Sequence, residues 1–264
     1  TWPGTTGAGD LQIQFVLAKR DPNCNPTTGI DRTDGSGVAN YVSGGVIPQG
    51  SSGPGTDEVN IKNLIRWDPT QYYNIWIVNK IMGQDGTSGQ FIAGYAYFPL
   101  PFDPLRDGTV MLATQMVAGQ KSLPHEIRHA FNLYYPFQGS TDKNTCPPHP
   151  NNDCNLDGDQ VCDTDPISEN ISAGIVDFTC RSSSTVNPCA TPAGTTYSPN
   201  TESNYMNYTN CYTLFTAGQK ARMLASAATS RSSLTTSLGG AATNTGSSPC
   251  PPKINFETSS DQAT

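Results

Sequence analysis

Alternating apolar and polar positions predict strands along the first half of the chain. The alternation is clearest in four segments, 11–18, 72–81, 89–100 and 109–117, and it is typical of strands with one buried face. A stretch rich in Gly, Ser and Pro at 43–58 separates the first two segments and predicts a loop. We therefore expect this half of the chain to form a sheet.

The apolar period becomes helical from Ser122 onward. Apolar side chains then recur at helical spacing, at Ile127, Ala130, Phe131 and Tyr134. Ser122 is a suitable N-cap, and Asn132 is a suitable end because asparagine accepts the left-handed conformation. Pro136 also disfavours helix at the residue before it. The pattern predicts a short helix that ends at Asn132 or before Pro136.

The second half of the chain is mostly polar and contains one further helix signal. Residues 138–210 show little periodicity, so we expect disulfides or bound ions to hold them. Thr216 and Gln219 have the spacing of a capping box, which predicts a second helix. Residues 229–250 are rich in Ser, Thr and Gly, as linkers are. The last segment, 251–264, alternates again and predicts a tail strand or the start of a further module.

Composition and charge argue against some classes of function. The 264 residues suffice for one large domain or two modest lobes with a sizeable core. Asp and Glu outnumber Lys and Arg by 22 to 15, and no basic cluster is present to bind a phosphate backbone. No apolar run approaches the roughly 20 residues that span a bilayer. We therefore expect neither a nucleic-acid partner nor a membrane span.

The 8 cysteines point to an oxidising compartment. They show no C-x-x-C spacing of a structural zinc knuckle, so disulfides are the better interpretation, although sequence does not give their pairing. The first residues contain neither an initiating Met nor a signal-peptide pattern. We expect a processed or partial chain that is secreted or held at the cell surface.

The candidate chemistry lies in the predicted helix. Two of the 3 histidines, His125 and His129, flank Glu126 in the pattern His-Glu-x-x-His. One helical turn is about 3.6 residues, so both imidazoles project from one face and can bind one zinc ion. Glu126 lies beside them and can take a proton from metal-bound water. The pattern predicts a zinc hydrolase.

Five blocks of the chain, taken together and in order, resemble the pappalysin family of metzincin zinc proteases, particularly its bacterial members. The blocks are "IQFVLAKRDPNCNPTTGIDRT", "KNLIRWDPTQYYNIWIVNKI", the zinc-binding stretch "LPHEIRHAFNLYYPFQG", "GDQVCDTDP" and "NYMNYTNCYTLFTAGQKARM". The resemblance covers about residues 10 to 228. It implies an α+β metzincin-like domain. An upper lobe to about residue 132 would hold a twisted mixed sheet and the active-site helix, and an irregular, disulfide-linked lower lobe would span 133–228.

The resemblance also implies roles for individual residues. His125 and His129 match zinc ligands, Glu126 matches the general acid/base, and Met206 matches the methionine of the turn beneath the metal. The upper rim of the cleft, where a substrate adds as an extended strand, matches Gly94, Tyr95, Ala96 and Tyr97.

One ligand position departs from the family. Its motif, H-E-x-x-H-x-x-G-x-x-H, places Asn132 at the glycine and Tyr135 at the third histidine. Three outcomes follow: Tyr135 binds as a phenolate, His149 supplies the third ligand, or the site is weak and the protein inactive. Arg128 replaces a usually small residue, and its positive charge disfavours zinc if it lies close.

An acidic loop at 153–165 predicts a calcium site. It contains five Asp residues on a Gly-containing segment, and clustered carboxylates suit calcium, which takes oxygen ligands in flexible geometry. Asp157, Asp159 and Asp163 are the best candidates. The resemblance supports this prediction, because family members bind calcium in this part of the chain.

These observations together predict a secreted zinc metalloendopeptidase that hydrolyses extended polypeptide, with zinc and calcium as cofactors. The alternative is a catalytically impaired structural or binding protein on the same scaffold. The family's first strand and backing helix have no counterpart in the chain, so the alternative includes a filament subunit that exchanges a strand such as 251–264.

Overall fold

The computed structural model describes residues 13–169, 186–190, 192–198, 201, 203–208 and 213–243. Two compact units are present. The larger combines residues 1–15 with 31–237, and the smaller combines 16–30 with 238–264. The predicted tail strand 251–264 lies outside the described residues.

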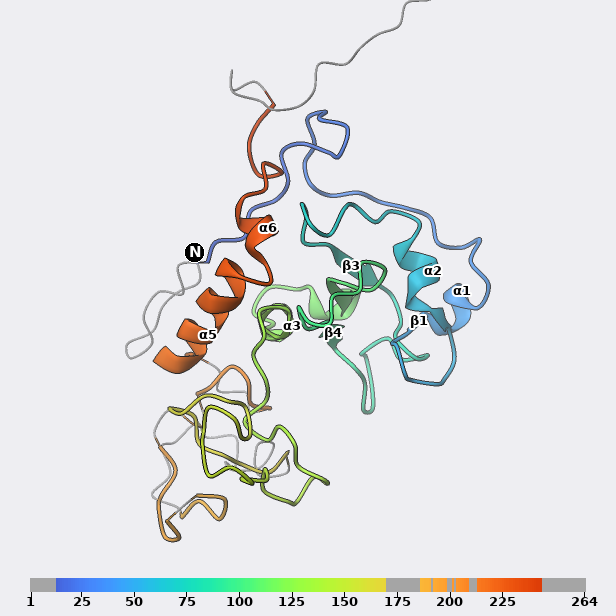
Figure 1. The fold of residues 1–264 in the computed structure, drawn as a ribbon. Helices are drawn as coiled ribbons and strands as arrows, with labels where there is room; N and C mark the ends of the chain where they lie inside the picture. The colour runs from blue at the N-terminus through green and yellow to red at the C-terminus, as the bar shows by residue number, and fades with distance from the viewer. Residues whose placement is uncertain are drawn as a thin grey trace, which may run out of the picture. The chain divides into compact units, whose positions relative to one another are not determined.

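The larger unit contains all the helices and strands assigned in the described residues (Figure 1). In chain order they are α1 (Tyr41–Gly44), β1 (Val46–Ile47), β2 (Thr56–Asp57), α2 (Glu58–Lys62), β3 (Ile75–Val78), β4 (Gly94–Ala96), β5 (Thr109–Leu112), the 3-10 turn η1 (Ala113–Gln115), α3 (Ser122–Ala130), α5 (Ala217–Ala228) and α6 (Ser232–Thr235). This content confirms the α+β fold class. None of the described helices is long and apolar enough to cross a membrane.

The main sheet of the described chain is mixed. Its strand order is β3-β5-β4, in which β3 runs parallel to β5 and β4 runs antiparallel to it. Three of the predicted strand segments contain these strands. All four residues of β5 are buried, whereas β3 buries only Trp76 and Val78. The alternation in β3 is therefore that of a strand with one buried face.

Two hydrophobic clusters lie against this sheet. One joins Trp76 and Val78 of β3 to Ile61 of α2 and to residues of β1 and β5. The other joins Ile127 and Ala130 of α3 to Met223 and Ala227 of α5. The helix α3 therefore packs on β4 and β5 on one side and on α5 through this second cluster.

Two predictions from the sequence differ from the structure. The described part of the first predicted strand, 13–18, forms no regular strand. Ile13 packs partly buried on the core, and Phe15 contacts the rings of Tyr73 and Phe131 although it is 38% exposed. Leu17 is exposed, so the alternation does not correspond to a buried face here. The segment predicted as a linker from 229 is folded up to Ser237 and contains α6 and the buried Arg231.

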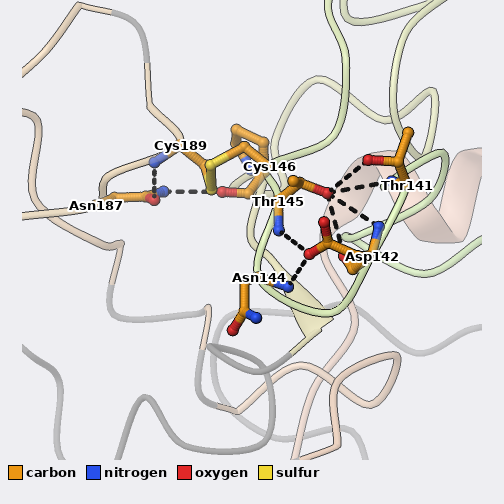
Figure 2. The surroundings of a disulfide bond; sticks show 8 residues. Thr141, Asp142, Asn144, Thr145, Cys146, Asn187 and Cys189 are labelled. Atoms are coloured by element: carbon orange, nitrogen blue, oxygen red, sulfur yellow. Dashed lines mark hydrogen bonds between the residues drawn. A yellow bond between two sulfur atoms is a disulfide. The ribbon is translucent and has the colours of Figure 1, made fainter.

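The region after α3 is irregular and is held by disulfides, as predicted. Residues 131–168 contain only turns and bends. Disulfides join Cys146 to Cys189 and Cys154 to Cys162, and no described cysteine is free. Figure 2 shows that side chains also fix the backbone around the first bridge: Asp142 accepts hydrogen bonds from the N–H groups of Asn144 and Thr145. Short polar side chains thus replace regular structure in satisfying backbone groups.

The smaller unit is built around one arginine. The side chain of Arg20 donates to the carbonyls of Ala241 and Ala242, at 3.0 and 2.9 Å. The backbone N–H of Lys19 donates to the carbonyl of Gly239 at 2.8 Å. These bonds join the two chain segments of the unit to each other.

Candidate active site

The helix α3 carries the three residues of the His-Glu-x-x-His pattern. It begins at Ser122, one residue earlier than expected, because Lys121 occupies the N-cap position. His125, Glu126 and His129 are all buried. The two imidazole rings lie 5.1 Å apart between centroids, as residues one helical turn apart do.

Each histidine is oriented by a backbone carbonyl. Nδ1 of His125 lies 2.8 Å from the carbonyl oxygen of Tyr205, and Nδ1 of His129 lies 2.7 Å from that of Leu133. A carbonyl only accepts, so Nδ1 must carry the proton in both rings. Nε2 then holds a free lone pair on each imidazole, which is the usual arrangement in metal-binding histidines.

Both imidazoles are neutral. Burial lowers the pKa of His125 to about 3 and that of His129 to about 4. The positive charge of Arg128 also lowers the pKa of both histidines. The guanidinium of Arg128 lies over the rings of Phe215 and Tyr205, at 3.6 and 4.1 Å from their centroids. The neutral form is the one that binds metals, whereas the Arg128 charge disfavours a further cation.

Glu126 is held in an apolar environment. Burial raises the pKa of its carboxyl to about 8. The group therefore keeps a proton at neutral pH unless a cation lies close, because burial disfavours the charged form and a nearby positive charge restores it.

Tyr135 is brought to the two histidines. Its ring centroid lies 4.5 Å from that of His129 and 5.4 Å from that of His125, and its hydroxyl lies 3.4 Å from Nε2 of His125. The chain turns toward the site at Asn132, which has a φ of 70°, the left-handed conformation expected for this residue. Burial raises the pKa of the Tyr135 phenol.

His149 does not join this cluster. It is exposed and interacts electrostatically with Asp157. Among the described residues, no three His, Cys, Asp or Glu side chains are close enough to hold one metal ion. The side chain at the position of the family's third histidine, Tyr135, is the one that lies beside His125 and His129.

The donor set fits a zinc ion. Nε2 of His129 is buried and has no hydrogen-bond partner, and a buried polar atom without a partner is costly unless something binds it. Nε2 of His125 lies 3.4 Å from the Tyr135 hydroxyl. Two imidazole nitrogens and one phenol oxygen are ligand types that zinc and similar ions accept.

Met206 lies in the core next to this site. It is fully buried, in the cluster that contains Ile127 and Ala130 of α3. Its N–H donates to Oδ1 of Asn204 at 2.9 Å, and the side chains of Asn204 and Gln219 form two hydrogen bonds with each other at 3.0 and 3.1 Å. Gln219 also completes the predicted capping box with Thr216. The start of α5 therefore fixes the turn that carries Met206.

Tyr208 is a site residue that the sequence analysis missed. Its ring lies 5.3 Å from that of Tyr135 and 6.3 Å from that of His125, and the residue is 42% exposed. Burial of its phenol raises the pKa, so the hydroxyl stays protonated and can donate a hydrogen bond. Its position two residues after Met206, in "NYMNY", was the available signal.

The predicted rim strand forms one edge of the sheet within the described residues. β4 pairs only with β5, and its next residue, Tyr97, donates its N–H to the Gly108 carbonyl. The hydroxyls of Tyr95 and Tyr97 both bond to the buried carboxylate of Glu58. The backbone groups of β4 that point away from β5 are thus available for an added strand.

The acidic loop does not bring its carboxylates to a common point. Each of the three candidate Asp residues accepts hydrogen bonds from its own surroundings: Asp157 from Asn151, Asp159 from Thr164 and Val161, and Asp163 from the N–H of Gly218 at the start of α5. Burial raises the pKa of Asp159 to about 7. Calcium binding stays a prediction.

Comparisons with known proteins identify relatives of this chain. A family model, Peptidase_M43 (Pregnancy-associated plasma protein-A), matches residues 55–228. An extracellular metalloprotease of Colletotrichum graminicola is 27% identical over 186 residues, which cover 63% of this chain and 53% of the relative. One of Neurospora crassa is 32% identical over 144 residues, which cover 49% of this chain and 42% of the relative. The chain spans about half the length of these curated relatives.

A solved structure gives the same picture. Mature mirolysin of Tannerella forsythia, in complex with a cleaved peptide, matches with a TM-score of 0.59 and 27% sequence identity. The match covers 90% of this chain and 80% of mirolysin.

Proposed function

The chain belongs to the Peptidase_M43 family, and from this premise we propose that it is a zinc-dependent endopeptidase that hydrolyses extended polypeptide. The observation that carries the proposal is the convergence of His125, His129 and Tyr135 beside the buried Glu126. The relatives named as metalloproteases and the similarity to mirolysin support it.

His125, His129 and Tyr135 would hold the metal. When bound, zinc lowers the pKa of a water molecule to about 7 and polarises a carbonyl group. The two carbonyl-anchored imidazoles offer their ligand nitrogens without further adjustment. Tyr135 must lose its proton to become a strong ligand, and a nearby cation favours that loss.

Glu126 would act as the general base and then as the acid. Its burial places the carboxylate where a proton taken from the attacking water is not lost to solvent. The same carboxyl can return that proton to the leaving amine. Its raised pKa, about 8, suits the first step, because a weaker acid is a stronger base when ionised.

The substrate would bind along β4 and face Tyr208. An extended peptide can pair with the outward backbone groups of Gly94 and Ala96, which lie on the strand that α3 packs against. The partly exposed hydroxyl of Tyr208 could then donate to the carbonyl oxygen as negative charge develops on it.

Location and calcium complete the proposal. The described disulfides require an oxidising compartment, and relatives carry the description extracellular, so we place the protein outside the cell.

Calcium at Asp157, Asp159 and Asp163 would have to displace their present hydrogen bonds. A chelator that leaves the melting temperature unchanged in a variant without zinc ligands would exclude this calcium site.

The second candidate is a scaffold that has lost its chemistry, and Tyr135 in place of histidine favours it. Cleavage of an unfolded protein such as casein should be compared for the parent, Glu126→Gln and Tyr135→His, with zinc content measured for each. An active parent, and a loss of about 100- to 10,000-fold in Glu126→Gln at unchanged zinc content, is the expected result. Activity that appears only in Tyr135→His would establish the impaired scaffold.

A further inference from the structure

The turn that follows α3 depends on a side chain from α5. α3 ends at Ala130 with Phe131 as its C-cap, and Asn132 is the first residue beyond the cap. The carbonyl of Asn132 accepts a hydrogen bond from Nε of Arg222 at 2.6 Å. Asn132 is the left-handed residue that redirects the chain toward the site. Arg222 therefore fixes the point from which Tyr135 is aimed.

Arg222 makes a second contact with the same segment. Its guanidinium lies 4.8 Å from the centroid of the Tyr134 ring. That ring is 4.9 Å from the ring of Phe98, which in turn is 5.4 Å from the imidazole of His129. Tyr134, directly before Tyr135, is thus held between Arg222 and Phe98. Phe98 in turn lies beside the predicted metal ligand His129.

The histidine itself holds the segment from the other side. Nδ1 of His129 donates to the carbonyl of Leu133, between the two residues that Arg222 contacts. Asn132, Leu133 and Tyr134 are each anchored, so the backbone that leads into residue 135 is held in place. Orientation of a ligand by such outer contacts affects metal affinity strongly, by about 10- to 100-fold when they are removed.

We propose that Arg222 is a positioning residue that sets the side chain of residue 135 for metal binding. The inference rests on the proposed function, because it assumes a metal at His125 and His129. An arginine is required because the planar guanidinium donates from Nε and covers an aromatic face at once. Lysine keeps the charge and the length but offers only a point contact.

A double-mutant cycle tests the proposal. The apparent zinc dissociation constant, from competition with a chromophoric chelator, should be measured for Arg222→Lys in three backgrounds: the parent, Tyr135→Phe and Tyr135→His. We expect Arg222→Lys to weaken zinc binding by about 10- to 100-fold in the parent and in Tyr135→His. In Tyr135→Phe, which has no ligand to position, the loss should stay below about threefold.

Two controls separate positioning from general damage. Arg66→Lys changes an arginine that also donates to a carbonyl, that of Leu105 at 3.2 Å, and it should leave zinc affinity unchanged. Thermal unfolding in excess chelator reports the stability of the metal-free fold. If Arg222→Lys does not fold, Arg222→Gln takes its place in the cycle.

The outcomes are distinct. Equal losses in all three backgrounds, or no loss in the parent and in Tyr135→His, would overturn the positioning role. If Tyr135→Phe binds zinc as well as the parent, Tyr135 is not a ligand and that part of the proposed function fails. A loss from Arg222→Lys confined to Tyr135→His would then still support the positioning of residue 135.

Discussion

The guanidinium of Arg231 and the carboxylate of Asp107 form a two-point ion pair, with nitrogen–oxygen distances of 2.7 and 2.6 Å. Both side chains are only 2% exposed. Nε of the same guanidinium donates to the carbonyl of Ala130 at 2.9 Å, which is the last residue of α3. Arg231 therefore joins the end of α3 to the segment before β5.

Removal of Arg231 should destabilise the fold severely. Arg231→Met leaves the Asp107 carboxylate buried without its cation and the Ala130 carbonyl without its donor, and breaking such a buried pair costs about 3–5 kcal/mol. Urea unfolding of the metal-free protein measures the change. Lys143→Met, which breaks the exposed pair with Glu169, is the control and should cost at most about 1 kcal/mol. Equal effects in the two variants would contradict the structural role of Arg231.

Replacing Gln219 should lower the free energy of unfolding by more than the loss of a helix cap alone. Gln219→Ala removes the capping-box bond to Thr216 and also both bonds to Asn204, which orders the backbone at Met206. A lost cap costs about 0.5–2 kcal/mol, and buried polar groups left without partners add about 1–3 kcal/mol. Thr216→Ala removes only the cap side chain. If unfolding shows the two variants to be equally stable, the link to Asn204 contributes nothing.

Gly94 should not accept a side chain. A Cβ at this position would lie 2.7 Å from the carbonyl oxygen of Val110 and closer still to the sulfur of Met111. Gly94→Ala should therefore push β4 from β5 and cost about 1–3 kcal/mol, and it should raise KM for a peptide substrate more than it lowers kcat. Gly37→Ala is a useful comparison for stability, since a Cβ there meets no atom within 4 Å and its φ is not in the left-handed region. A Gly94→Ala variant with parental stability would contradict the close packing of β4.

The local signals in the sequence predicted the parts of the site that depend on neighbours in the chain. Helical spacing placed His125 and His129 on one face, and the tolerance of asparagine for the left-handed conformation predicted the turn at Asn132. The capping box likewise predicted the start of α5. In each case the determining contacts lie within a few residues, so a pattern of residue types is enough.

The contacts that hold the site in place had no such signal. Arg222 and Arg231 appear in the sequence as ordinary polar residues near a Ser-rich segment, and their partners lie 90 and 101 residues away. The linker prediction was wrong for 229–237 for the same reason. Alternation at 13–18 identified Ile13, which packs on the core, but also marked Leu17, which is exposed; strand pairing depends on a partner that the pattern does not contain.

The anchoring of α3 by residues far downstream also determines when the candidate site can form during synthesis. The acceptor for Nδ1 of His125 is 80 residues downstream, and the donors to the carbonyls of Asn132 and Ala130 come from 90 and 101 residues downstream. At about 5–20 residues per second, a ribosome needs several seconds after making His129 before these groups exist. A nascent chain can therefore contain the whole His-Glu-x-x-His pattern while its two histidines are still unanchored, and the candidate site is assembled only after Arg231 has been made.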